Sequence, residues 1–181
     1  MTIVITGNPG VGKHTIAKEI SQKKHLVVID INEIAKNENL FEKNDETNDV
    51  DTEKLKEILR PKISTKSIIV GHLAPYVLDK NQIDNVIVLR RNPYDLLDVY
   101  TDRGYSEEKS RENAGSEILG VTAFDAINQF EEKVVEINVS DKKIPVVEKI
   151  EKVISGKKDS EQIDWLELVT KNDDLKKFFV D

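Results

Sequence analysis

The chain of 181 residues is long enough for a substantial hydrophobic core and fits a single domain, residues 1–181. Its formal net charge of −7 and its pI near 5.1 argue against direct, sequence-specific binding of nucleic acid, which requires a basic surface. Cysteine is absent and no stretch approaches the ~20 apolar residues of a membrane span, so we expect no disulfide, no thiolate metal site, no membrane partner and a cytoplasmic location.

The chain is predicted to begin with a strand at residues 3–6, a glycine-rich turn and a helix at 13–24. The turn, residues 7–13, reads Gly-Asn-Pro-Gly-Val-Gly-Lys and fits the phosphate-binding pattern G-x-x-x-x-G-K in its required context. Glycines allow the backbone to point N–H groups at an anion, and the following helix adds its positive dipole end. The alternative, an ordinary Gly/Pro turn with a solvated lysine, does not explain why glycines, lysine and flanking periodicity agree.

This motif predicts the contacts of a nucleoside triphosphate. The residues expected to bind ATP are Gly10, Val11, Gly12, Lys13, His14 and Thr15. Lys13 is expected to be catalytic, because its ammonium would lie near the β/γ-phosphate junction, where charge develops during phosphoryl transfer. His14 stands where the pattern has Ser or Thr, and imidazole is a poor ligand for the hard Mg²⁺ ion. We therefore expect Mg²⁺ as cofactor with Thr15 contributing through water, and ATP as phosphoryl donor.

Further strands are predicted at residues 26–30, 67–70 and 85–89, with a fifth at 137–139. Nearly continuous apolar runs of this kind are typical of strands buried on both faces of a parallel sheet. Helical patterns lie around residues 51–60, 93–102, 106–118, 121–136 and 145–155, and an amphipathic helix near the C-terminus places Trp165 in the core. The alternation of strands and helices predicts a three-layer α/β fold of the P-loop NTPase type with a parallel sheet.

The segment between the second and third predicted strands, residues 31–50, is longer than one crossover helix requires. Beside a phosphate-binding loop, such an insertion is expected to form part of a second substrate site. The alternative is a surface loop kept in solution by its charged residues. Asp30 precedes this segment and is the nearest carboxylate by topology for a metal ion, because Val70 stands where an acidic residue is expected at the end of the third strand.

Two further positions are candidate catalytic residues. His72 follows the strand at 67–70 and should face the crevice of the phosphate-binding loop, where it could orient a water or the attacking oxygen; a structural histidine is the alternative. Arg103 and Arg111 belong to a segment, residues 102–112, that is expected to form a short lid over the triphosphate. Because a guanidinium can bridge transferring phosphoryl oxygens, Arg103 in its predicted turn is the preferred catalytic arginine. Alternatively, these arginines pair with acidic residues on helix faces.

Six stretches together resemble the adenylate kinase isoenzyme 6 family, and most closely its archaeal members. They are Gly-Asn-Pro-Gly-Val-Gly-Lys-His-Thr at 7–15, Asn-Glu-Ile-Ala-Lys-Asn-Glu-Asn-Leu-Phe at 32–41, Gly-His-Leu at 71–73, Val-Leu-Arg at 88–90, Arg-Gly-Tyr-Ser-Glu-Glu-Lys-Ser-Arg-Glu-Asn at 103–113 and Ser-Glu-Ile-Leu at 116–119. The resemblance runs from about residue 1 to 170 in family order. The family consists of small P-loop kinases and ATPases that also act as assembly factors binding ribosomal protein uS11.

The resemblance implies transfer of phosphate from ATP to AMP or another NMP, slow ATP hydrolysis, and a role in maturation of the small ribosomal subunit and its rRNA. It implies an NMP-binding segment near residues 30–53, with contacts from Asp30, Asn32 and Lys36. It also implies that Arg103 contacts ATP and Arg111 contacts the NMP. His72 matches the histidine of the family's Asp-x-His motif, which is linked to ATP hydrolysis.

Three residues depart from the family pattern: His14 replaces a threonine, Val70 replaces the acid of Asp-x-His, and Lys36 replaces an arginine. These departures concern turnover more than nucleotide binding. An alternative function is therefore a nucleotide-switched assembly factor that binds uS11 and the pre-small subunit with little kinase turnover. Its candidate contact for a basic partner is an acidic patch, Asp45, Glu46, Asp49 and Asp51.

Overall fold

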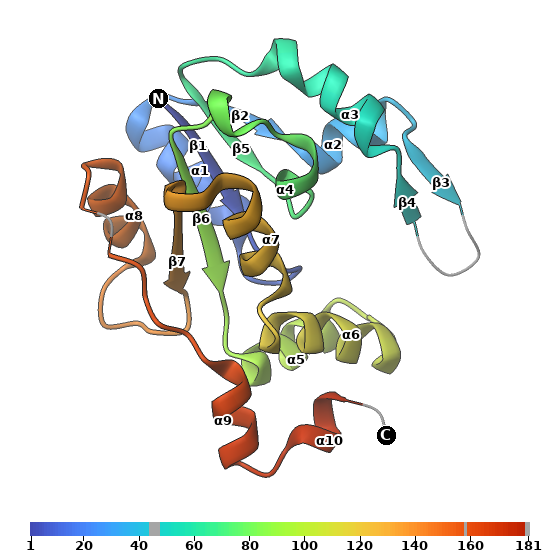
Figure 1. Cartoon of the computed structure of the whole chain (residues 1–181). Helices are drawn as coiled ribbons and strands as arrows, with labels where there is room; N and C mark the ends of the chain where they lie inside the picture. Colours follow the sequence, from blue (N-terminus) through green and yellow to red (C-terminus); the bar gives the residue numbers. More distant parts are fainter. Residues whose placement is uncertain (44–47, 158, 180–181) are drawn as a thin grey trace.

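The structure, a computed structural model, describes residues 1–43, 48–157 and 159–179. Five parallel strands form the central sheet in the order β2-β5-β1-β6-β7 (Figure 1). Their bounds are β1 Thr2–Thr6, β2 Val27–Asp30, β5 Ser67–Val70, β6 Asn85–Arg90 and β7 Val134–Asn138. Since β1 is central and the phosphate-binding loop follows it, the loop lies at the carboxyl edge of the sheet, where ligands of such folds bind.

Helices pack on both faces of this sheet, because successive side chains of its strands point to opposite sides. Ile3 and Ile5 of β1 belong to one core cluster, and Val4 belongs to the other. The first cluster includes residues of α1 Lys13–Lys24, α5 Pro93–Asp102, α6 Glu107–Ile118, α8 Val146–Ile154, α9 Trp165–Lys171 and α10 Leu175–Phe178. The second includes residues of α2 Ile31–Asn37, α3 Thr52–Leu59, α4 Ala74–Val77 and α7 Val121–Phe130. The predicted three-layer α/β fold is confirmed.

Three predictions of local structure were wrong in part. The strand β2 is not buried along its length, because it is the edge of the sheet and its Val27 and Val28 side chains are 63% and 42% exposed. The helix predicted at 121–136 ends at Phe130 and is followed by a 3₁₀ turn, Glu131–Lys133. The fifth strand, predicted at 137–139, spans Val134–Asn138, because pairing with β6 extends it.

The long segment after β2 contains α2 and a separate antiparallel pair, β3 Phe41–Lys43 and β4 Asn48–Val50. Figure 1 shows this pair projecting beside α3, away from the central sheet. Two residues of the predicted acidic patch, Asp45 and Glu46, lie outside the described residues. Within the part of the chain that is described, no helix is both long and apolar enough to cross a membrane.

The C-terminal segment packs against α6. Trp165 of α9 is 8% exposed and lies in the core, as expected, while Phe178 of α10 is also buried. Phe178 meets Tyr94 edge-to-face at a centroid distance of 5.2 Å, and the Tyr94 hydroxyl donates to Asp174 at 2.7 Å. These contacts fix the last helices beside α5 and α6. Two further 3₁₀ turns, Arg60–Lys62 and Lys80–Gln82, precede β5 and β6.

Candidate functional site

The loop between β1 and α1 has the conformation that its glycines permit. Gly7, Gly10 and Gly12 have φ values of 133°, 89° and 93°, a region that residues with a side chain rarely adopt. A Cβ atom at Gly7 would also lie 2.4 Å from the carbonyl oxygen of Leu89. The backbone therefore needs glycine at these positions, which supports the interpretation of the sequence motif.

Lys13 closes the loop from inside. Its Nζ donates hydrogen bonds to the carbonyl oxygens of Gly7 and Asn8, each at 2.8 Å, and the side chain is 6% exposed. With these carbonyl groups turned toward the ammonium, the loop holds the positive charge of Lys13 in place before any ligand binds.

Two donors from the other side of the loop hold the next two carbonyl groups. The Tyr100 hydroxyl of α5 donates to the carbonyl oxygen of Pro9 at 2.8 Å. Arg91, which precedes α5, donates through Nη1 to the carbonyl oxygen of Gly10 at 3.0 Å. Carbonyl groups fixed on the outer side orient the peptide planes of a phosphate-binding loop. The sequence did not predict this position for either Tyr100 or Arg91.

The pKa values of two predicted site residues, Lys13 and His72, respond to charges on other predicted site residues. Burial, together with the positive charge of Arg103, lowers the pKa of Lys13 to about 8, and the Glu117 and Asp30 carboxylates act in the opposite direction. Burial lowers the pKa of His72 as well, and the charge of Lys13 contributes. The charges of Arg103 and Asp30 thus act on Lys13, and that of Lys13 acts on His72, although the four residues come from separate parts of the chain.

Arg103 occupies the predicted turn. It is the C-cap of α5, and Gly104 follows with a positive φ of 68°. Ser106 then caps α6 by accepting a hydrogen bond from the Lys109 N–H at 3.2 Å. This break between two helices places Arg103, which is exposed, at the C-terminal end of α5.

His14 has a definite partner. Its Nε2 lies 2.8 Å from Asp30 Oδ2, and the other oxygen of Asp30 accepts from the backbone N–H groups of Asn32 and Glu33 at the start of α2. Asp30 therefore connects the first turn of α1 to the helix that opens the predicted acceptor segment. Sequence spacing alone gave no indication that residues 14 and 30 are in contact.

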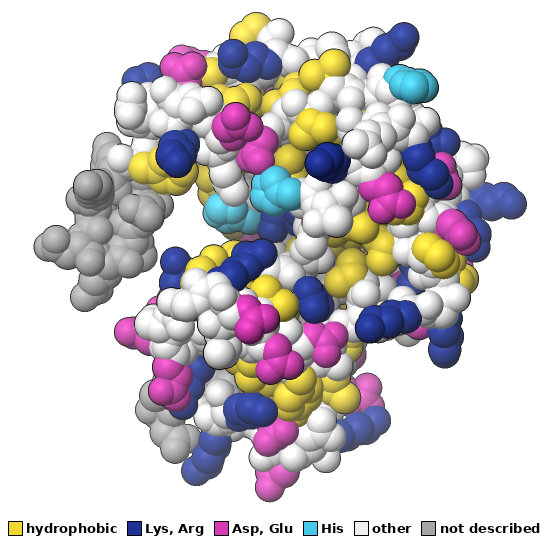
Figure 2. All heavy atoms as spheres, turned by 180° about the vertical axis from the view of Figure 1, so that it is seen from behind, with side chains coloured by type: hydrophobic (Ala, Val, Ile, Leu, Met, Phe, Trp, Pro, Cys, Tyr) yellow, Lys and Arg dark blue, Asp and Glu magenta, His cyan; other side chains and the backbone are white. Residues whose placement is uncertain are grey.

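A cavity of about 990 Å³ lies beside the loop, between the predicted acceptor segment and α6. Its lining residues are Pro9, Phe41, Val50, Thr52, His72, Leu73, Tyr76, Tyr105, Ser106, Glu108, Lys109, Glu112 and Asn113. Figure 2 shows a hollow on this side of the molecule, with histidine and Lys or Arg side chains gathered around it. The cavity has apolar and aromatic walls on one side and polar α6 residues on the other, which suits a small molecule with a flat ring and a charged group.

A second cavity, of about 560 Å³, includes the other end of the loop. It is lined by Val11, Gly12, Thr15, Ile16, Arg91, Asp95, Asp98, Val99, Asp102, Val139, Ser140, Lys142 and Val146. The two cavities share the loop as a common border. This arrangement permits two ligands to approach the same phosphate-binding residues.

Not every predicted site residue lies at this centre. Arg111 pairs with Glu107 and faces a groove between α6 and the C-terminal segment, so it does not line the cavity that contains His72. Lys36 lies exposed on α2, and Thr15 lines the second cavity rather than contacting Asp30. The pairing of Arg111 with a glutamate is the alternative that the sequence analysis left open.

Glu117 is the most informative residue that sequence reasoning missed. It belongs to the buried stripe of α6, with Ser110, Ala114 and Ile118 at helical spacing. A glutamate on the apolar stripe of a predicted helix was the available signal, because buried carboxylates require partners. Its partners include the loop residue Asn8.

We expect the pKa of His72 to be below its ordinary value in the free protein and to rise when ADP binds, because phosphate charge would offset the charge of Lys13. Imidazole proton shifts in an NMR titration measure this pKa, with His72→Gln used for assignment. Exposed His25 provides the internal control, since it lies at the end of α1 away from the cavity residues. A His72 pKa that does not respond to ADP would contradict the proximity of this histidine to bound phosphate.

The residues present suit a metal ion that arrives with a nucleotide. Within the described residues no group of three or more His, Asp or Glu side chains converges in a way that could hold an ion. Asp30 offers a carboxylate oxygen within reach of residue 14, the position that usually supplies the metal ligand in such loops. Mg²⁺ commonly binds through one or two carboxylates plus substrate phosphates, and Asp30 fits this pattern.

Comparisons with solved structures support the fold. The YorR protein of Bacillus subtilis, solved in complex with phosphorylated GDP, matches 86% of this chain and 96% of its own with a TM-score of 0.60 and 16% identity. Shikimate kinase of Bacteroides thetaiotaomicron matches 86% and 98%, with a TM-score of 0.59 and 17% identity. At these identities the likeness establishes the shared fold alone.

Proteins found by sequence comparison are more similar to this chain than these solved structures are. A family described as an AAA domain matches residues 3–120. A protein of Methanosarcina barkeri named "Putative adenylate kinase" is 38% identical, covering 93% of this chain and 100% of its own. A protein of the same name from Methanocaldococcus jannaschii is 35% identical, covering 92% and 94%. The chain belongs to this P-loop family and, within it, to the group of archaeal proteins that carry the adenylate kinase name.

Proposed function

We propose that this protein is a nucleoside monophosphate kinase of the adenylate kinase type, which transfers a phosphoryl group from ATP to AMP and hydrolyses ATP slowly. The observation that carries this proposal is the phosphate-binding loop, with Lys13 at its centre and a separate cavity on each of its borders. The names of the archaeal relatives support the same activity.

In the proposed reaction ATP binds with its triphosphate on the loop, contacting Gly10, Val11, Gly12, Lys13 and the first turn of α1. AMP occupies the larger cavity, between the segment at residues 30–53 and α6. The triphosphate would draw the Lys13 ammonium away from the Gly7 and Asn8 carbonyl groups toward the transferring phosphate. Preorganised positive charge at that point stabilises the transition state.

Arg103 would neutralise charge on the transferred phosphoryl group from the lid side. His72, neutral at pH 7 because its pKa is lowered, can accept a hydrogen bond from the acceptor or from a water. Asp30, with His14 and the cap of α2, would orient the acceptor segment against the loop. Asn32 and Lys36 lie on the same helix and remain candidate contacts of the NMP.

Mg²⁺ would be held by the nucleotide phosphates and Asp30, with Thr15 contributing through water, and it would supply charge neutralisation between the phosphates. In the structure His14 Nε2 contacts Oδ2 of Asp30, so this oxygen would have to be released from the imidazole to bind the ion. The chain thus replaces the usual hydroxyl of the loop with a group that binds the carboxylate instead.

We expect His14→Thr to lower the Mg²⁺ concentration needed for half-maximal activity. A threonine hydroxyl is a direct oxygen ligand, and its introduction frees Asp30 Oδ2 from the imidazole. Nucleotide affinity should change little, since the loop amides supply most of the phosphate contacts. Activity measured across a Mg²⁺ titration checks this, with His14→Gln as a control that keeps an N–H donor.

Identical Mg²⁺ titrations for wild type and His14→Thr would show that this position has no part in metal binding. Complete loss of activity in the variant would instead show that His14 takes part directly in catalysis.

The proposed function is tested by measuring ADP formation from ATP with each nucleoside monophosphate in turn, at high enzyme concentration. We expect AMP to be the preferred acceptor and hydrolysis without acceptor to be slower. Intact ATP binding without turnover on any monophosphate would reject the kinase proposal.

A role as an assembly factor that binds ribosomal protein uS11 is the second proposal, favoured by the net charge of −7, which would attract a basic partner. Of the acidic patch, Asp51 caps α3 by accepting from Lys54 N–H at 3.0 Å, and Asp49 lies in β4. Co-purification with uS11, with and without nucleotide and at raised salt, tests this role. Failure to form a complex at low salt would reject it.

A further inference from the structure

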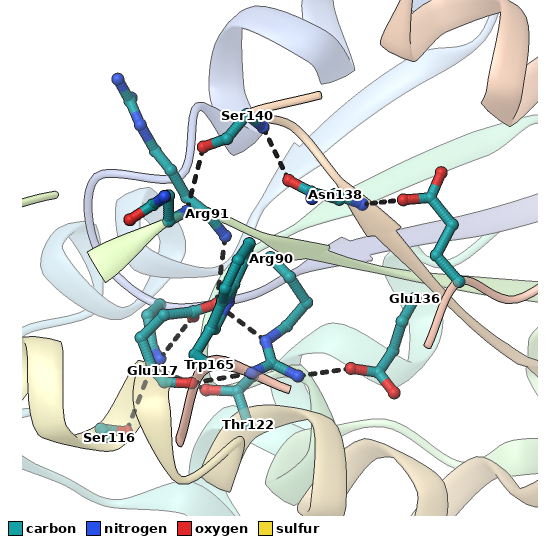
Figure 3. A network of polar contacts seen from close by, with 12 residues as sticks. Arg90, Arg91, Ser116, Glu117, Thr122, Glu136, Asn138, Ser140 and Trp165 are labelled. Carbon is teal, nitrogen blue, oxygen red and sulfur yellow. Dashed lines mark hydrogen bonds and ion pairs between the residues drawn. The ribbon is translucent and has the colours of Figure 1, made fainter. Parts of the chain in front are cut away.

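One buried carboxylate joins the phosphate-binding loop to three other parts of the chain. Glu117, in the last turn of α6, is fully buried, and its Oε1 accepts from Arg90 Nε at 2.8 Å and from the Arg91 N–H and Trp165 Nε1 at 3.0 Å each. Figure 3 shows Arg90, Arg91 and Trp165 converging on this carboxylate. The donors come from β6, from the residue after it, and from α9.

The second oxygen of Glu117 holds the loop itself. Oε2 accepts from Asn8 Nδ2 at 2.8 Å, and the side-chain oxygen of Asn8 accepts from Thr122 Oγ1 at 2.9 Å and Ser116 Oγ at 3.3 Å. Asn8 is the second residue of the loop and is itself buried. Both the nitrogen and the oxygen of the Asn8 side chain are therefore directed at the junction of α6 and α7, not at the nucleotide.

The charge of Glu117 is balanced in place. Arg90 donates to the carboxylate, to the Glu117 backbone oxygen at 2.7 Å, and to Glu136 on β7. Burial raises the pKa of Glu117, while Arg90 and the N–H donors act to lower it. A buried carboxylate without these partners would be strongly unfavourable, so the network keeps one arrangement.

We propose that Asn8 and Glu117 are positioning residues of the donor site, which fix the start of the phosphate-binding loop against α6 so that its amides are aligned before ATP binds. The proposal rests on the proposed function in that the donor nucleotide binds at this loop. Three groups outside the loop then hold it: the Tyr100 hydroxyl, the Arg91 guanidinium and the Glu117 carboxylate, which accepts from the Asn8 amide. Only the last of these bonds connects the loop to the helix that lines the acceptor cavity.

Asn8→Ala cuts this connection at the loop and leaves Glu117 with its other three donors. Glu117→Gln keeps the shape of the side chain but turns an amide donor toward Asn8 or toward Arg90 and Trp165. We expect each variant to weaken ADP binding about tenfold, the effect of one charged hydrogen bond lost from a buried site. Calorimetric titration with ADP and with a non-hydrolysable ATP analogue measures the affinity, and thermal unfolding confirms that each variant is folded.

Glu136→Gln is the matched control. It makes the same chemical change on the other glutamate that pairs with Arg90, yet Glu136 has no bond to the loop among its described contacts. We expect ADP affinity within about twofold of wild type for this variant. A drop equal to that of Glu117→Gln would show that the network merely stabilises the fold, and would overturn the proposal.

Two readouts separate positioning from general loosening. If α6 stays in place, the KM for ATP should rise while the KM for AMP stays unchanged. A displaced α6 would disturb the acceptor cavity and raise both KM values. In addition, Glu117→Gln should have no further effect on ADP affinity in the Asn8→Ala background, since Glu117 acts on the loop through Asn8. Additive effects in the double variant, or a parallel rise in both KM values, would overturn the proposal.

Trp165 provides a signal that does not depend on activity. It is the single tryptophan of the chain, and its indole N–H is bonded to Glu117. ADP binding should change its fluorescence in the wild type, and the change at saturation should be smaller in Asn8→Ala. Equal ADP affinities and equal fluorescence changes in both proteins would refute the inference alone, whereas absence of ADP binding to wild type would refute the proposed function instead.

Discussion

Lys13→Met is expected to lower the rate of phosphoryl transfer by on the order of 10³-fold, the effect of removing one preorganised positive group that stabilises the transition state. Methionine keeps most of the aliphatic stem, so the change removes the ammonium and little packing. In the structure that ammonium is buried and already lies against the loop, bonded to the Gly7 and Asn8 carbonyl oxygens. Single-turnover assays with ATP and AMP measure the loss.

The control for this variant is Lys18→Ala, which removes an exposed lysine from the same helix. It should leave the rate within about twofold of wild type, because surface charges contribute little. Lys13→Arg restores a charge but not the compact ammonium that fits under the loop, so it should recover only part of the rate. If Lys13→Met retained full activity, the loop would not be the site of phosphoryl transfer.

The beginning of the fold could be predicted because its signals are local. A β-branched run, glycines that allow positive φ, and apolar residues at helical spacing follow one another in the first part of the chain, and the structure has β1, the loop and α1 in these places. The same holds for β5, whose predicted and observed bounds coincide at residues 67–70. In these segments each residue's conformation depends mainly on its sequence neighbours.

The edge of the sheet could not be predicted in the same way. The run at Val27 and Val28 has the composition of a central strand, but its exposure depends on β2 having a single neighbour, β5. Strand order results from long-range pairing and crossover connections. A strand of apolar residues therefore looks the same in sequence at the edge and at the centre.

The candidate site shows the same limit. Lys13, His72 and Arg103 could be placed near one another because parallel strands end at one edge and the lid follows from a turn. The contacts that fix their surroundings join distant residues: Asn8 and Glu117 are 109 positions apart. The direction of Arg111 depends on how α6 packs on the C-terminal segment, and no local pattern contains that information.

The second large expected effect concerns Arg103. Arg103→Ala should reduce the rate of transfer between ATP and AMP by about 10³-fold, at the lower end of the range for a catalytic arginine. Its positive charge contributes to the lowered pKa of Lys13, so it acts on the loop lysine in the structure. ADP affinity should fall much less than the rate, because the charge it would neutralise develops in the transition state.

Arg111→Ala is the matched control for Arg103→Ala. Both arginines belong to the segment predicted as a lid, but Arg111 pairs with Glu107 and faces the groove beside Phe178. Its removal should change the rate by no more than about threefold, as expected for an exposed pair. Arg103→Lys should lie between the two, since it keeps charge without the planar fork. A large loss with Arg111→Ala and a small one with Arg103→Ala would mean that α6 turns during the reaction to bring Arg111 onto the phosphates.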